Sequence, residues 1–196
     1  MMNTRYFNPF LLFFVLLGVM ASCGNASKED QIEDLIDRAD DAKINSVYDN
    51  PYEYNQAIIG LQTEIGIQLI QAETIEEVEK AKETILENTQ ALEKLIYSGI
   101  DYGFKSSMVD LFSFYLRLTE NEYLEIFDLV AEMEENPNDS SFVRDRYNRI
   151  IEIQNNIDEE EMELSNAMLS SQEEFAAKNN FRLIDNPLDD EINAIN

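Results

Sequence analysis

The sequence predicts an all-α fold, an up-and-down antiparallel bundle of four to five helices with one long C-terminal helix. Hydrophobic residues make up 44% of the chain, enough to bury a core, while only six glycines and four prolines interrupt it. Apolar residues recur at three-and-four spacing in successive segments. Helix-start signals separate these segments, and short connections favour antiparallel neighbours.

Two helices are expected in the first part of the domain. Residues 28–47 carry apolar side chains on one stripe that begins at Ile32. Residues 50–53, with the sequence NPYE, offer a cap, a proline at the first helical position and a glutamate at the third. They predict a second helix from Pro51 to about Ala72.

A capping box at residues 74–77, TIEE, opens a third helix that runs to about Leu95. Asn88 falls in the apolar seam of this helix, where a buried amide could fix the register of packing. Alternatively, Asn88 lies at the edge of the stripe and points to water. The second interpretation is favoured, because one asparagine carries little weight.

The clearest break inside the domain is the loop GIDYGF at residues 99–104. The next segment, residues 107–135, is apolar on more than one face and is expected to be the central element. A second capping box begins at Thr119 within it and predicts a kink or a restart there.

The last helix is expected at residues 140–179, after the turn NPND at 136–139. It is longer than a compact bundle requires, so it should overhang, bend or pack on two successive layers. No strand pattern of comparable strength is visible in the sequence.

The net charge limits the partners that the protein can have. Acidic residues number 40 against 14 basic ones, which gives a formal charge of −26. A chain of this charge repels nucleic acid, and it is disfavoured from lying flat on anionic lipid. The excess of acid favours solubility or attraction of a cationic partner.

The residue types that are missing argue against an enzyme. The chain has no histidine and a single cysteine, Cys23, so it lacks the usual general base and every Ser-His or Cys-His pair. It also lacks a Gly-rich phosphate loop and a nucleophile elbow. We expect no catalytic residues, no bound cofactor and no metal centre; any metal site would be built from carboxylates alone.

The first residues of the chain have the pattern of a secretory signal. Arg5 precedes an apolar run at residues 10–20, which is too short to cross a bilayer. Small residues follow it directly. The sequence Met20-Ala21-Ser22-Cys23 resembles the lipobox of bacterial lipoproteins.

That resemblance implies cleavage before Cys23 and a covalent lipid on its thiol, so that the mature protein is attached to a membrane. Ser27, Lys28, Glu29 and Asp30 resemble the signal that sends lipoproteins of some Gram-negative bacteria to the outer face of the outer membrane. Ser27 and Asp30 also fit a helix capping pattern. Surface display is slightly favoured over an orientation toward the periplasm, and the tetrapeptide is an export signal, a helix cap or both.

The chain therefore divides into four parts: a signal peptide (1–22), a lipidated N-terminus with a short tether (23–27), a helical bundle (28–180) and an acidic C-terminal tail (181–196). We expect a lipid-anchored, non-enzymatic envelope protein whose acidic bundle binds or scaffolds another envelope or extracellular protein. The alternative is a lipoprotein that binds a small ligand at the Tyr102 and Phe104 loop, or a divalent cation at the tail.

Three groups of side chains are candidates for chemistry. A run of acids in the last helix is expected to be a solvated face, because consecutive helical residues point around the axis; it comprises Asp158, Glu159, Glu160, Glu161 and Glu163. The tail offers oxygen ligands without the order of a calcium loop, at Asp185, Asp189, Asp190 and Glu191. An aromatic set is expected to be core more than pocket, and comprises Tyr97, Tyr102, Phe104, Phe112, Phe114 and Tyr115.

Overall fold

The structure is a computed structural model that describes residues 28–183. Within these residues 81% are helical, which confirms the all-α prediction. The elements in chain order are α1 (Lys28–Ile44), β1 (Val47–Tyr48), α2 (Pro51–Ile70), α3 (Ile75–Lys94), β2 (Ile96–Tyr97), α4 (Phe104–Glu120), α5 (Glu122–Glu135) and α6 (Ser140–Lys178).

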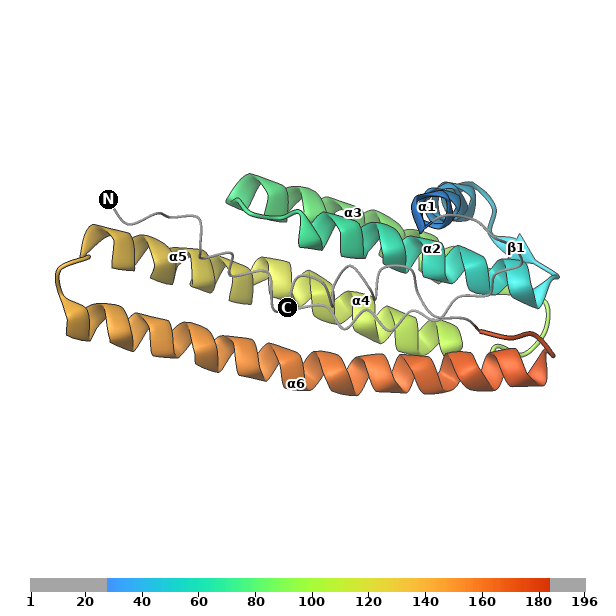
Figure 1. The fold of residues 1–196 in the computed structure, drawn as a ribbon. Coiled ribbons are helices and arrows are strands. Elements are labelled where there is room, and N and C mark those ends of the chain that lie inside the picture. The colour runs from blue at the N-terminus through green and yellow to red at the C-terminus, as the bar shows by residue number, and fades with distance from the viewer. Residues whose placement is uncertain (1–27, 184–196) are drawn as a thin grey trace.

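The helices are stacked in layers (Figure 1). Helices α2 and α3 form an antiparallel pair, α4 and α5 follow one another nearly in line below that pair, and α6 runs back along both. The long C-terminal helix is therefore explained by its two successive partners, as one of the sequence alternatives predicted. Helix α5 and the first half of α6 extend beyond the α2–α3 pair.

The sequence signals for helix starts are confirmed. The Asn50 side chain accepts a hydrogen bond from the backbone N–H of Tyr52 at 2.9 Å, and α2 begins at the proline between them. The Thr74 hydroxyl oxygen accepts one from the backbone N–H of Glu77 at 3.2 Å, and α3 follows. Each cap satisfies an N–H that has no partner within its helix.

The predicted restart inside the fourth segment is also confirmed, although the capping box at Thr119 does not form. Thr119 lies within α4, and its hydroxyl donates to the carbonyl oxygen of Leu116 at 2.7 Å. Helix α4 ends at Glu120 and α5 begins at Glu122, with Asn121 between them outside helical geometry. Helix α4 begins at Phe104, three residues earlier than the sequence pattern indicated. The preceding residues Tyr102 and Gly103 have positive φ, 54° and 83°, and turn the chain into the helix.

Helix α1 departs from the up-and-down arrangement. Figure 1 shows α1 nearly end-on, whereas α2 runs lengthwise across the picture, so α1 crosses α2 at a steep angle. The crossing is close at Gly60, where an added Cβ would lie 2.6 Å from the carbonyl oxygen of Leu35 and 2.8 Å from the backbone nitrogen of Ala39. The up-and-down bundle is thus made by α2, α3, the α4–α5 pair and α6.

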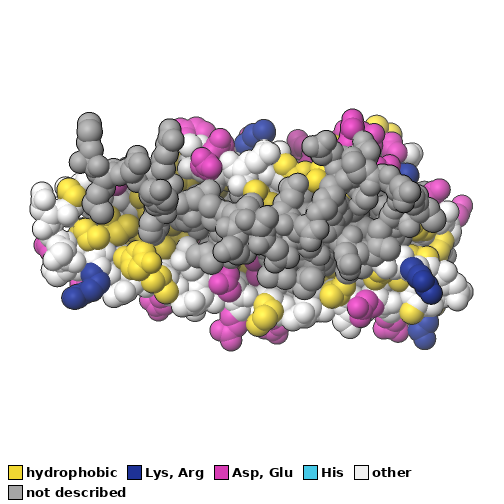
Figure 2. Space-filling view, viewed as in Figure 1, with side chains coloured by type: hydrophobic (Ala, Val, Ile, Leu, Met, Phe, Trp, Pro, Cys, Tyr) yellow, Lys and Arg dark blue, Asp and Glu magenta, His cyan; other side chains and the backbone are white. Residues whose placement is uncertain are grey.

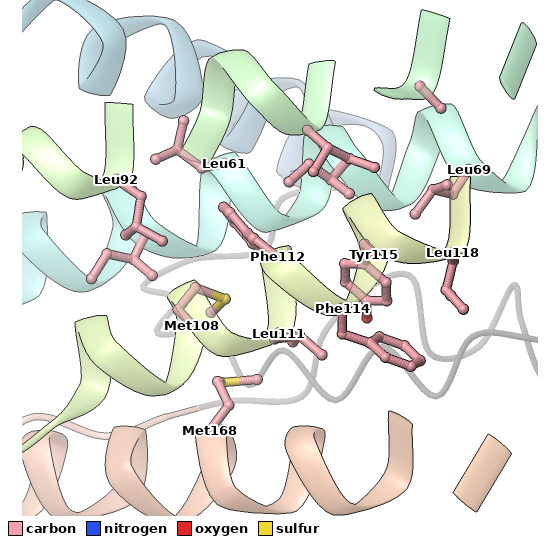
Figure 3. Packing of buried hydrophobic residues seen from close by; sticks show 14 of the residues in the cluster. Leu61, Leu69, Leu92, Met108, Leu111, Phe112, Phe114, Tyr115, Leu118 and Met168 are labelled. Carbon is pink, nitrogen blue, oxygen red and sulfur yellow. The ribbon is translucent and has the colours of Figure 1, made fainter. Parts of the chain in front are cut away.

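The hydrophobic core is built around α4, as the sequence predicted. Figure 3 shows Phe112 pointing toward the α2 side of the core, near Leu61, whereas Met108 and Leu111 approach Met168 of α6. These side chains are fully buried. One helix therefore joins both layers of the bundle, which is why it is apolar on more than one face.

Two features of the fold differ from the sequence prediction. A short parallel pair of strands joins β1 to β2, with Val47 opposite Ile96, and no strand was expected. Asn88 does not point to water: it is fully buried, and its amide donates to the carbonyl oxygen of Leu61 and to a carboxylate oxygen of Glu64, each at 2.9 Å. The favoured interpretation of Asn88 was wrong, because α2 supplies both acceptors.

Candidate functional site

The loop between β2 and α4 is held in place by one aspartate. The Asp101 carboxylate accepts hydrogen bonds from the backbone N–H of Gly103 at 3.2 Å and from the Tyr54 hydroxyl at 3.4 Å. Burial, and then the neighbouring Asp101 carboxylate, raise the pKa of Tyr54. Tyr102 is half-buried in this loop, with the Lys178 ammonium 6.0 Å from the centre of its ring. The loop is thus ordered by side chains from α2 and α6.

Phe104 does not line a pocket. It is fully buried and stacks on Phe175 of α6 with ring centres 5.8 Å apart, so its assignment to a ligand site was wrong. Phe175 also contacts Tyr54 at 5.7 Å and Tyr97 at 5.4 Å. The core interpretation of the aromatic set is confirmed for its buried members, which are Phe104, Phe112, Phe114 and Tyr115.

A cavity of about 390 Å³ lies beside this loop, at the end of the bundle where α2 begins and α3 ends. Its walls come from α2, β2, the loop and α4, and include Tyr54, Ile96, Tyr97, Ile100, Asp101 and Lys105. Tyr102 is absent from these walls, so the predicted ligand loop contributes different residues from those that the sequence singled out.

Two exposed apolar side chains line the cavity, and two more adjoin them through the strand pair and the chain before it. Ile96 and Ile100 are 58% and 69% exposed, and both line it. Val47, the strand partner of Ile96, is 64% exposed, and Ile44, the last residue of α1, is 82% exposed. We call these four residues the apolar tip. The sequence did not predict this cluster, because these residues lie at a helix end or in short connections and no sequence pattern indicated the strand pair.

Lysines stand at the same end of the molecule. Lys94 and Lys178 are the last residues of α3 and α6, where a cation complements the helix dipole. Lys105 lines the cavity and donates to the carbonyl oxygen of Leu95 at 2.8 Å. Among the described residues, these three lysines form no ion pair. Elsewhere acid dominates, and Figure 2 shows many more acidic than basic side chains on the visible face.

Glu161 is the second unusual group, and the prediction that its whole acidic run faces solvent was wrong. Its side chain is only 4% exposed and accepts a hydrogen bond from the Tyr115 hydroxyl at 3.0 Å. Burial raises the pKa of Glu161 to about 8, so the carboxyl group is mostly protonated at neutral pH. The sequence signal was present, because Glu161 interrupts the apolar stripe of the last helix.

Two tyrosines surround this carboxyl group. Tyr115 and Tyr123 are both buried, and burial together with the Glu161 charge raises the pKa of each. The cluster therefore stays uncharged near neutral pH. It joins α4 and α5 to α6, and serves the packing of the bundle rather than a surface site.

A polar cavity of about 290 Å³ lies nearby, between the α4–α5 junction and α6. Arg117 lines it and bridges Glu122 of α5 and Glu160 of α6. Arg149 bridges Glu125 and Glu152, each at 2.9 Å. Because both guanidinium groups are already neutralised by carboxylates, this cavity offers no unpaired cation to an anionic ligand.

One flank of α6 also exposes apolar side chains. Ile151 follows Tyr147 by one helical turn and Met162 follows Ile151 by three turns, so the three lie along one stripe, which Asn155 and Asp158 interrupt between Ile151 and Met162. They are 43%, 38% and 58% exposed in chain order. The stripe lies beside the core-facing positions of α6, which are filled by Ile150, Ile153 and Ile157.

The predicted anchor and tail residues lie outside the described part of the chain. This holds for Cys23 and Ser27, and for the tail acids Asp185, Asp189, Asp190 and Glu191. Lys28, Glu29 and Asp30 lie within α1. Across residues 28–183, no helix is long and apolar enough to cross a membrane, and no three acidic or cysteine side chains are grouped to hold a metal.

Comparison of the chain with known protein families, curated proteins and solved structures finds no match.

Proposed function

We propose that this protein is a lipid-anchored component of the cell envelope whose acidic helical bundle serves as a non-enzymatic interaction or scaffolding module. The lipobox-like sequence supports a covalent lipid on Cys23. The resemblance of residues 27–30 to an export signal supports attachment to the outer membrane of a Gram-negative bacterium, with surface display slightly favoured. The net charge of −26 favours a partner protein with a basic surface and opposes nucleic acid.

The observation that supports partner binding is the exposed apolar flank of α6. The bundle needs only the core-facing stripe of α6, and Tyr147, Ile151 and Met162 are exposed apolar side chains outside that stripe. Polar side chains lie around and between them, including Arg144, Glu152 and Asp158, so the flank is a mixed surface of the kind found in non-obligate interfaces. A partner helix or groove would be anchored by Tyr147, Ile151 and Met162.

Site-specific crosslinking in the native envelope tests this proposal. A photoreactive side chain at Met162 should give one discrete adduct, because that position lies within the contact. The matched control is Glu163, an exposed neighbour that points about 100° away around the helix. Equal adducts from both positions, or none from either, would contradict docking on this flank.

The second candidate function is the binding of a small ligand or a divalent cation. The cavity beside Ile100 and Asp101 supports it, although Phe104 itself is core. The acidic tail is the other expected cation site. Calcium titration of the mature chain, with an Asp101→Asn variant as control, separates them: a thermal shift lost in the variant favours the cavity, whereas a shift kept in both favours the tail. Absence of any shift with calcium would remove the cation alternative.

A further inference from the structure

We propose that the apolar tip docks on the surface of the lipid bilayer that holds the anchor, so that the bundle stands upright on the membrane. The inference rests on the proposed lipid anchor at Cys23. The tip would contact lipid, whereas the exposed flank of α6 would bind a protein, because these two surfaces lie on different parts of the molecule.

The first support is the composition of the tip. Its four aliphatic side chains are each more than half exposed, and the paired register of Val47 and Ile96 places two of them side by side. Ile100 shares the cavity wall with Ile96. A cluster of large exposed aliphatic residues is uncommon on a water-soluble surface and indicates contact with another apolar phase.

The second support is charge. Lys94, Lys105 and Lys178 stand around the tip and form no ion pairs within residues 28–183. Salt screens charges beyond about 8 Å at physiological ionic strength, so an anionic surface in contact with the tip would respond mainly to these lysines and to the acids beside them. The acidic body, which opposes lying flat, would then stand outside the screening distance.

Acids also lie beside the tip. Asp101 is engaged by Gly103 and Tyr54, and Asp49 and Glu93 are exposed near β1 and β2. Asp41 and Glu53 lie close enough to Tyr48 of β1 to raise its pKa, after the larger effect of burial. The three lysines therefore offset part of the acid around the tip, in a chain whose overall charge is −26.

The third support is the reach of the anchor. Helix α1 crosses α2 at Gly60, which lies nine residues, or about 14 Å, along the axis from the start of α2 at Pro51. Because α1 is steeply inclined to the bundle, the helix as a whole stays near the height of that crossing. The five residues from Cys23 to Lys28 span at most about 17 Å. A lipid on Cys23 can thus lie in the same plane that the tip would touch.

The chain contains no tryptophan, so a single introduced tryptophan reports the position of the tip. The mature chain, residues 23–196, is coupled through the Cys23 thiol to a maleimide lipid in vesicles of phosphatidylethanolamine and phosphatidylglycerol. The probe is Ile100→Trp. Its matched control is Ile75→Trp, an exposed isoleucine at the opposite end of α3. We expect blue-shifted emission and quenching by brominated acyl chains for Ile100→Trp, and neither effect for Ile75→Trp.

Further variants test the basis of docking. Lys94→Gln and Lys178→Gln should each lower the ratio of docked to undocked tips about fivefold on anionic vesicles, as should higher salt. Lys80→Gln, an exposed lysine in the first half of α3, should leave that ratio unchanged. Val47→Glu should abolish quenching of the Ile100→Trp probe.

Two results would overturn the proposal. In the first, the tethered Ile100→Trp protein keeps the emission maximum of a solvent-exposed tryptophan, and brominated lipid does not quench it. The other is a concentration-dependent blue shift without vesicles, which would make the tip a contact between copies of this chain. Because the tether is made chemically, both results are independent of whether cells attach a lipid to Cys23.

Discussion

Glu161 makes the stability of this protein depend on pH. The folded protein holds the Glu161 proton up to about pH 8, whereas the unfolded chain releases it near the ordinary pKa of 4.5. Between these values the folded state binds more protons, so the free energy of unfolding decreases as pH rises. The stabilisation that the buried, protonated Glu161 contributes is complete below pH 4.5 and is lost as pH rises through about 8.

The expected size of this effect is on the order of a few kcal/mol. Glu161→Gln should remove it, so urea unfolding of the variant at a series of pH values should be nearly independent of pH in this range. Glu163→Gln, an exposed neighbour, is the control and should keep the slope. A wild-type protein whose stability does not fall between pH 5 and 8 would contradict a buried, protonated Glu161.

At the scale of single elements, the contact between α1 and α2 depends on Gly60. A methyl group there meets backbone atoms of Leu35 and Ala39, which cannot rotate away as a side chain can. Gly60→Ala should therefore destabilise the protein by about 1–3 kcal/mol through overpacking, although alanine favours a helix by about 1 kcal/mol. Hydrogen exchange should increase in α1 more than in α4. Unchanged protection of α1 would show that the helices do not meet closely at Gly60.

Local signals predicted most of the elements. The caps at Asn50 and Thr74 act within a single turn, so they can be read directly from the sequence, whereas α5 restarts at Glu122 without the side-chain cap that Thr119 suggested. The pairing of β1 with β2 joins residues nearly fifty positions apart, and each strand is two residues long, so no periodicity announces it. The angle of α1 was equally hidden, because a small contact residue such as Gly60 permits a close crossing without fixing its direction.

The candidate surfaces were less predictable than the fold. The sequence predicted the loop around Tyr102. It did not predict which side chains of that loop are exposed, because this depends on which of them α2 and α6 cover. Phe104 is covered by Phe175, and Ile100 is left in solvent. Glu161 and Asn88 were expected to face solvent and are buried. A polar residue in an apolar stripe is buried only if a distant helix supplies its hydrogen-bond partner, and the sequence does not show that helix.

At the scale of the whole molecule, the proposed lipid anchor implies that Ser27 to Asp30 act as an export signal in addition to any role as a helix cap. Replacing Lys28, Glu29 and Asp30 by alanine should keep the protein membrane-bound but reduce its release when intact cells are shaved with protease. Ser27→Ala alone is the control for loss of the cap. Equal release of wild type and triple variant would leave Ser27 to Asp30 as a helix cap only.

The most direct measurement is the mass of the N-terminal peptide of the protein purified from the membrane fraction of its own cells. We predict a peptide that begins at Cys23 and carries diacylglycerol on the thiol, while a Cys23→Ser variant remains an uncleaved precursor without lipid. A peptide with a free Cys23 thiol, or normal cleavage and detergent-phase partitioning of the Cys23→Ser variant, would contradict the lipid anchor on which the proposed function depends.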